Sequence, residues 1–112
     1  MEPIKFQNWQ NLDLRVGKIE EVENLQGTDK LYKISIDLGK NLGKRTLIAG
    51  LKQYYKQQEL IGKNCIVFTN LESKKIRGIE SSGMILAAVN ENESKVQILQ
   101  PDKEIEIGSR IR

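Results

Sequence analysis

The sequence contains no histidine and only one cysteine, and both shortages exclude common kinds of chemistry. Without histidine the chain cannot form a Ser-His-Asp triad or a Cys-His pair, and it lacks the usual proton donor near neutral pH. Zinc sites that use histidine are excluded for the same reason. The single cysteine, Cys65, cannot form an internal disulfide, which indicates a reducing compartment. We therefore expect no cofactor, no metal and no catalytic residues, so that the chain by itself is not an enzyme.

Long hydrophobic runs are also missing. No window of about eighteen apolar residues exists, as a membrane span requires, and the N-terminus MEPIKFQNWQ lacks the apolar core of a signal peptide. We expect a cytoplasmic protein with no membrane partner. The 112 residues are enough to fold as one domain, residues 1–112, and Met1 with its short leader favours a free-standing chain over a fragment.

Two features resemble parts of enzyme sites without completing them. In residues 39–46, GKNLGKRT, three residues separate the glycines where a phosphate-binding loop has four, and Arg45 stands where that loop needs Ser or Thr. A basic turn between strands is the better interpretation. Glu20, Glu21 and Glu23 crowd one strand end, but no apolar pocket is visible that would raise a carboxylate pKa. A small enzyme that uses the Glu20 cluster is the weakest of three functional hypotheses.

The charge of the chain is unevenly distributed. Between Lys40 and Arg77 there are nine basic and two acidic residues, a net charge of +7, whereas the rest of the chain carries a net charge of −4. A basic middle inside an acidic frame is typical of a face that meets polyphosphate. The alternative is that folding scatters these cations over different faces.

The hydrophobic pattern is that of short strands with glycine-marked turns. One short helix or a few turns are expected over 51–61, and Gly17 interrupts the first strand at a phase break typical of a bulge or a sharp bend. This pattern predicts an all-β chain, a small five-stranded OB-fold barrel with a short helix and a C-terminal extension, with a split sandwich as the alternative. The expected strands are 12–22, 32–38, 45–49, 63–69, 84–89 and a short run at 95–99.

The most informative stretch is 70–88, NLESKKIRGIESSGMILAA. It places Lys74, Lys75 and Arg77 within four positions beside Gly78, which would let a bulky anion approach the backbone. Closely spaced cations favour phosphate oxygens, and the planar fork of arginine can also stack on a base. A three-charge cluster taken alone is more often a solvated loop.

Several ordered motifs resemble the tRNA-binding OB domain family. Its members include stand-alone tRNA-binding proteins and the beta subunit or C-terminal domain of methionyl-tRNA synthetase. The similarity runs from about Leu12 to Arg112. It is carried by DLRVGKI at 13–19, DKLY at 29–32, IDLG at 36–39, RTLIAGL at 45–51, and Asn70-Leu71, Lys75, Arg77-Gly78, Ser81 and GMIL at 83–86.

The chain departs from the family pattern at three places. The family usually has His-Pro-x-Ala before the second strand, where this chain has Leu25-Gln26-Gly27-Thr28. Ala49 replaces a frequent serine, as in the archaeal methionyl-tRNA synthetase branch. Ser82 replaces a common glutamine, which removes one amide side chain.

The resemblance implies a non-catalytic module that binds the outer corner of L-shaped tRNA. Residues 70–84 should lie beside the turn 40–45 and form one basic groove. Cations would neutralise phosphates, Asn70 and Ser81 would supply neutral hydrogen bonds, and Met84 would pack on a sugar or base. The candidate RNA-binding residues are Lys40, Lys44, Arg45, Asn70, Lys74, Lys75, Arg77, Gly78, Ser81 and Met84.

Partners remain open at this point. The resemblance implies a homodimer, and Ile105, Ile107 and Ile111 could form its surface or cover the barrel itself. It also implies a separate methionyl-tRNA synthetase catalytic subunit, for which this chain would recruit tRNA. One family branch resembles export-related chaperones, so binding of unfolded polypeptide in the groove is the alternative function.

Overall fold

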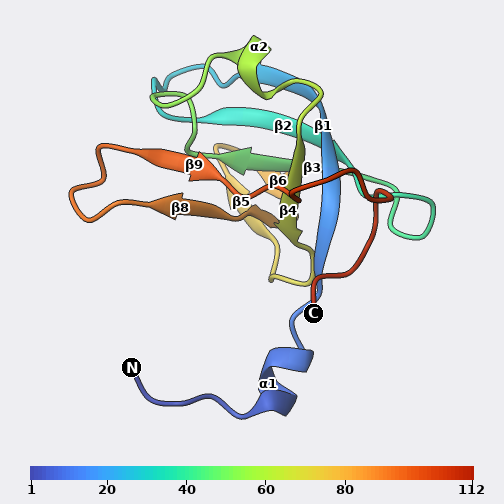
Figure 1. Cartoon of the computed structure of the whole chain (residues 1–112). Coiled ribbons are helices and arrows are strands. Elements are labelled where there is room, and N and C mark those ends of the chain that lie inside the picture. The colour runs from blue at the N-terminus through green and yellow to red at the C-terminus, as the bar shows by residue number, and fades with distance from the viewer.

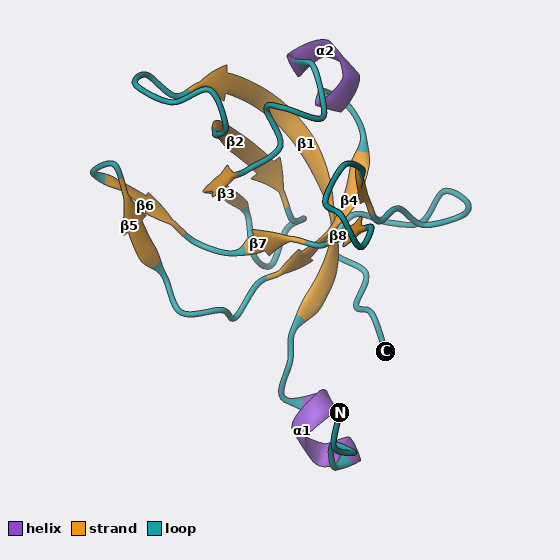
Figure 2. Cartoon of the chain, turned by 90° about the vertical axis from the view of Figure 1, so that its left-hand side faces the viewer, coloured by secondary structure: helices purple, strands orange, loops and turns teal.

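The computed structural model describes all 112 residues, and its centre is the long strand β1 (Leu14–Asn24). β1 pairs with β2 (Tyr32–Asp37) along its second half and with β4 (Asn64–Phe68) along its first half. β3 (Lys44–Ala49) and β7 (Met84–Ile85) extend this antiparallel sheet, whose strand order is β3-β2-β1-β4-β7. The sheet curls around one core as a small OB-type barrel, as predicted (Figures 1 and 2).

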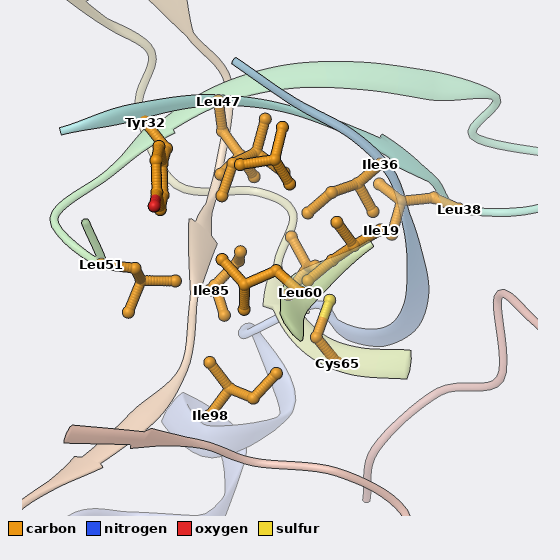
Figure 3. Close-up of a cluster of buried hydrophobic side chains, with 13 residues drawn as sticks. Ile19, Tyr32, Ile36, Leu38, Leu47, Leu51, Leu60, Cys65, Ile85 and Ile98 are labelled. Carbon is orange, nitrogen blue, oxygen red and sulfur yellow. The ribbon is translucent and has the colours of Figure 1, made fainter. Parts of the chain in front are cut away.

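The barrel is held together by aliphatic side chains from alternate strand positions. In β2, Tyr32, Ile34 and Ile36 are buried, while Lys33 and Ser35 between them are only half-buried. They belong to a cluster of 13 buried residues that includes Leu60 from α2 (Gln57–Leu60) (Figure 3). Full burial of one such side chain contributes roughly 1.5–3 kcal/mol. The expectation of a short helix or turns over 51–61 is confirmed, because α2 spans one turn.

Of the two features predicted for Gly17, a bulge or a sharp bend, the bulge is wrong. The irregularity of β1 lies between Ile19 and Glu21, whereas Gly17 pairs regularly with Cys65. The phase break has another cause, because β1 is covered on both faces. Leu14 and Val16 belong to one hydrophobic cluster and Ile19 to the other. Gly17 is needed for space, since a Cβ there would lie 2.7 Å from Ile36 Cγ2.

The C-terminal residues form the cover of the second face. Hydrogen bonds from the Val16 amide to the Ser109 carbonyl (2.9 Å) and from the Ile111 amide to the Leu14 carbonyl (2.8 Å) lay this segment along β1. Ile107 and Ile111 pack on a cluster of Leu14, Val16 and Ile66, while Ile105 stays 47 % exposed. Two of the three C-terminal isoleucines therefore cover the barrel of their own chain.

The segment expected as a loop over 70–84 contains a β-hairpin. β5 (Lys74–Ile76) pairs with β6 (Ile79–Ser81) around Arg77-Gly78. The base of this hairpin closes the barrel against β3: the Ile48 amide donates to Ser81 Oγ (2.9 Å) and the Ser82 amide donates to the Thr46 carbonyl (3.1 Å). The outer part of the hairpin projects beside the barrel (Figure 2).

The expected strand 84–89 is divided into β7 and β8 (Ala87–Val89). The division falls at Leu86, where the chain leaves β4. The Leu86 amide donates to the Ile66 carbonyl of β4, and the Leu86 carbonyl accepts from the Leu99 amide. β8 then pairs with β9 (Val96–Ile98), which confirms the sixth expected strand.

The sequence did not indicate α1 (Phe6–Gln10), which buries no residue and stands away from the barrel (Figure 1). Neither helix is long and apolar enough to cross a membrane.

Candidate nucleic-acid interface

The β5–β6 hairpin carries the densest group of free cations. Lys74 and Lys75 are exposed on β5, and Arg77 occupies the turn with φ 51°, followed by Gly78 with φ 79°. Two consecutive positive φ values are those of a type I′ turn, which matches the twist of a two-stranded ribbon. The three ion pairs of the chain involve Arg15, Lys44 and Arg110, so none of the hairpin cations is in an ion pair, although Lys75 faces Glu80 across the hairpin.

An apolar hollow lies beneath this hairpin. Its volume is about 520 Å³. Ile76 lies at the end of β5, Ile48 comes from the outward row of β3, and Leu71 and Met84 flank the hairpin. Leu71 is 39 % and Met84 44 % exposed. Lys74 and Glu72 also line the hollow, so charged side chains of both signs border its apolar residues.

A polar hollow lies on the other side of the hairpin base. It joins the start of β3 to residues at the base of the hairpin, so the two segments are neighbours, but none of Lys74, Lys75 and Arg77 lines it, and the single basic groove stays a prediction. Lys40 is not part of it: this residue is exposed in the turn between β2 and β3. The neighbouring Gly39 abuts the C-terminal segment, since a Cβ on Gly39 would lie 2.8 Å from the Ile107 carbonyl oxygen. The lining residues are Lys44, Arg45, Thr46, Thr69, Ser73, Glu80 and Ser82.

Lys44 and Arg45 are less free than the hairpin cations. Lys44 Nζ lies 3.0 Å from Glu20 Oε1, and this hydrogen bond and charge raise the pKa of the Lys44 ammonium. Arg45 donates through Nη1 to the Thr69 carbonyl. These contacts leave the Lys44 side chain largely in solvent but fix the Arg45 guanidinium near the barrel end.

Asn70 and Ser81 hold the fold together. Asn70 Oδ1 accepts from the Asp13 amide (2.8 Å), and its Nδ2 donates to the Asn11 carbonyl (2.7 Å). Ser81 is 5 % exposed, and its hydroxyl oxygen receives the Ile48 amide. The sequence placed both residues as neutral donors to RNA, but the structure uses their side chains to lock the two ends of the hairpin segment.

Sequence reasoning missed a contact between the hairpin tip and the first loop. A Cβ built on Gly27, at φ 82°, would lie 3.0 Å from Arg77 Nη1, so the guanidinium lies directly over this glycine. Lys52 Nζ donates to the Thr28 carbonyl (3.3 Å) in the same loop. The departure from the family pattern at 25–28 was the available signal, because only glycine leaves room here.

Other basic residues of the middle region lie elsewhere. Figure 2 shows α2 well away from β5 and β6. Lys63 lies three residues after α2, with Nζ 5.3 Å from the centre of the Tyr55 ring. The net charge of +7 therefore splits between faces. No group of three or more Cys, Asp and Glu side chains is gathered to hold a metal ion.

The sequence matches one family model over most of its length and resembles several known proteins. A family model described as "Putative tRNA binding domain" matches residues 14–110. The chain is 52% identical over 112 residues to a methionine–tRNA ligase of Pyrococcus horikoshii and 46% identical over 109 residues to one of Nanoarchaeum equitans. The first match includes 100% of this chain and the second 97%. The chain spans only 15% of the length of the first relative and 14% of the length of the second.

Solved structures extend over the whole chain. A methionyl-tRNA synthetase (MetRS) related protein from Pyrococcus horikoshii superimposes with a TM-score of 0.92 at 31% identity, covering 100% of both chains. The chaperone CsaA of Bacillus anthracis gives a TM-score of 0.88 at 28% identity, covering 99% of this chain and 100% of that one.

Proposed function

The chain belongs to the family of tRNA-binding domains, and from this premise we propose that the β5–β6 hairpin is the surface through which it binds tRNA. The observation that carries the proposal is that Lys74, Lys75 and Arg77 are exposed on one short hairpin and that none of them forms an ion pair, although Lys75 faces Glu80 across the hairpin. Lys44 and Arg45, across the polar hollow, extend the same basic surface. Phosphate contacts of this kind recognise the shape of folded RNA, since paired RNA hides its base edges from side chains.

A salt titration tests this assignment. Each neutralised phosphate contributes about 0.7 to 0.9 to the slope of log affinity against log salt. We expect a slope of very roughly −3 to −5 for unmodified protein and total tRNA. Replacing Lys74, Lys75 and Arg77 together by alanine should reduce the steepness by about 2 to 3 and weaken binding at least about tenfold.

The matched control replaces three exposed lysines outside the hairpin: Lys56→Ala, Lys95→Ala and Lys103→Ala. It removes the same net charge and should change affinity far less. A flat salt dependence, or equal losses in both triple variants, would contradict the hairpin as the binding surface.

We further infer that the chain is a non-catalytic helper of methionyl-tRNA synthetase in the cytoplasm, as a separate beta subunit or a C-terminal domain. Its matches to methionine–tRNA ligases along its whole length support this role. A bound module raises the local concentration of tRNA at the catalytic subunit. Aminoacylation by the methionyl catalytic subunit at sub-saturating tRNA should show a lower KM for tRNA with little change in kcat when this chain is added. An unchanged KM would remove the synthetase assignment.

We also propose that the chain forms a homodimer. The surface for it is the N-terminal arm, residues 4–12, in place of the C-terminal isoleucines. Ile4 is 76%, Phe6 70% and Trp9 37% exposed on this arm. A contiguous apolar surface of this kind favours a partner. We expect sedimentation equilibrium at micromolar concentration to give twice 12.8 kDa, and Phe6→Ala with Trp9→Ala to give monomer. Ile61→Ala, at a 49 % exposed apolar position elsewhere, is the control.

The alternative function, binding of unfolded polypeptide, is favoured by one observation, the likeness to the chaperone CsaA. The apolar hollow would then accept an extended segment without help from the cations. The hairpin triple variant separates the two functions, because it should lose tRNA but keep suppressing aggregation of a denatured protein if the chaperone function is correct.

A further inference from the structure

We propose that the apolar hollow beneath the β5–β6 hairpin holds one unpaired base of the bound tRNA. The inference deepens the proposed tRNA-binding function and rests on it. The hollow has an apolar floor of Ile48 and Ile76 between the flanking side chains of Leu71 and Met84. A flat, weakly polar ligand with two large faces fits such a site, because both faces can be covered by apolar side chains.

The position of Ile48 makes the hollow unusual on this surface. In the pairing of β2 with β3, Ile48 faces Lys33 in the outward row, next to the pair Ser35 and Thr46. The rest of this row is polar, yet Ile48 is only 9 % exposed because the hairpin folds over it. Leu71 and Met84 remain 39 % and 44 % exposed beside it. The chain therefore leaves two large apolar side chains in water at the edge of a formed hollow.

Charge decides which occupant fits. Lys74 and Glu72 both line the hollow, while Lys75, which faces Glu80 across the hairpin, and Arg77 follow Lys74 on the same hairpin, so cations outnumber carboxylates around it. An apolar lining with an excess of cations nearby complements a nucleotide, whose base is apolar on its faces and whose phosphate is anionic. In folded RNA only loops, bulges and ends offer bases that can leave the stack, so the occupant is an unpaired nucleotide.

The inference separates two kinds of contact that respond differently to salt. Loss of a phosphate contact lowers the salt slope, whereas loss of a stacked base lowers affinity at every salt concentration. We expect Leu71→Ala with Met84→Ala to weaken tRNA binding about 10- to 100-fold with the salt slope unchanged. Lys74→Ala should reduce the slope by about 0.8. Both apolar side chains are exposed, so the double variant should melt close to the unmodified protein.

Ile61→Ala with Val89→Ala, at positions 49 % and 53 % exposed, is the matched control and should bind tRNA normally. A twelve-nucleotide single-stranded RNA and a blunt, fully paired RNA duplex of that length provide the second readout. The Leu71/Met84 variant should lose affinity for the single strand and keep that for the duplex. Normal tRNA binding by this variant would overturn the base site alone, and absent tRNA binding by the unmodified chain would overturn the proposed function as well.

A third outcome has its own signature. A denatured, reduced polypeptide would then displace the single-stranded RNA. The Leu71/Met84 variant would no longer bind the polypeptide, whereas Lys74→Ala would still bind it. This result would mean that the hollow is a peptide site and that the inference is wrong.

Discussion

Single residues set how much of the basic surface is available to a ligand. Lys44 is already paired with Glu20 at 3.0 Å before any RNA arrives, and this pairing raises the pKa of its ammonium. An RNA phosphate must therefore compete with a bound carboxylate at this position, whereas neither Lys74 nor Lys75 is in an ion pair. Water screens exposed pairs of this kind, which limits the competition to a few-fold change in affinity.

Glu20→Gln should consequently tighten tRNA binding by about two- to fivefold at low salt, because it releases Lys44. Filter binding at about 50 mM salt measures the change, since screening is weaker there. Glu104→Gln alters the net charge equally at an exposed position of the C-terminal extension. Equal tightening in both variants would mean that net charge acts alone.

Cys65 shows how burial controls reactivity. Its side chain is fully buried, and burial raises the pKa of the thiol to about 12. Because the thiolate is the reactive form, we predict that an aromatic disulfide reagent at pH 8 leaves the folded protein unlabelled and labels one thiol per chain in denaturant. Absorbance of the released thiolate follows the reaction. Rapid labelling without denaturant would contradict the buried position.

At the scale of elements, the hairpin tip and the first loop act together. Arg77 lies over Gly27, so a methyl group at position 27 must push the guanidinium away. Gly27→Ala should therefore destabilise the fold by about 1 kcal/mol through its positive φ and also weaken tRNA binding several-fold. Urea unfolding and filter binding measure the two effects.

Gly62→Ala is the control that separates the backbone strain of a positive φ from the displacement of the Arg77 guanidinium. Gly62 has φ 87°, close to the φ 82° of Gly27, but a Cβ there meets nothing within 4 Å. It should lose similar stability and keep its tRNA affinity. If Gly62→Ala weakens binding as much as Gly27→Ala does, the contact with Arg77 has no role in recognition.

The elements that the sequence predicts well are those whose pattern is local. β2 alternates strictly because only one of its faces is buried, and its predicted bounds differ from the observed ones by one residue. The pattern of β1 was harder to interpret because both faces of this strand are covered, and the residues that cover the second face lie far along the chain. The hairpin carried a signal in Ile76-Arg77-Gly78-Ile79, but arginine is uncommon at positive φ.

In the candidate site, too, the local features could be predicted from the sequence and the contacts between distant residues could not. Adjacent cations on one segment, such as Lys74 and Lys75, are visible in sequence. The structural roles of Ser81 and Asn70 depend on Ile48 and Asn11, which are 33 and 59 positions away. The overlap of Arg77 with Gly27 is likewise a matter of tertiary placement. Periodicity contains no information about such partners.

At the scale of the whole molecule, Asp13 joins the beginning, middle and end of the chain. Its carboxylate accepts from the Thr69 hydroxyl and lies 2.9 Å from Arg15 Nε and 3.8 Å from Arg110 Nε. Burial raises the pKa of Asp13, but the hydrogen bonds of Thr69 and Arg15 and the charges of Arg15 and Arg110 outweigh it. The pKa therefore lies below the ordinary value of 3.8.

A lowered pKa fixes the sign of the pH dependence. The ionised carboxylate stabilises the fold above the pKa that Asp13 has in the unfolded chain, and this contribution is lost as pH falls through and below about 4. Asp13→Asn should cost about 1 to 3 kcal/mol at neutral pH and flatten the acid limb of stability. Urea midpoints between pH 6 and pH 3 measure both effects. Asp102→Asn, at an exposed position, should leave the pH profile unchanged.

The cover that the C-terminal segment lays over β1 has a consequence for the chain as it is being made. The Arg15 guanidinium and the Gly108 carbonyl that it contacts are 93 positions apart. A ribosome adding about 5 to 20 residues per second needs roughly 5 to 20 seconds to supply the second after the first. At the end of that interval the barrel strands have been made, but Leu14, Val16 and Ile66 still lack the cover of Ile107 and Ile111, so the nascent chain exposes an apolar strip to other nascent chains. Residues 107–111 must be translated before the strip is fully covered.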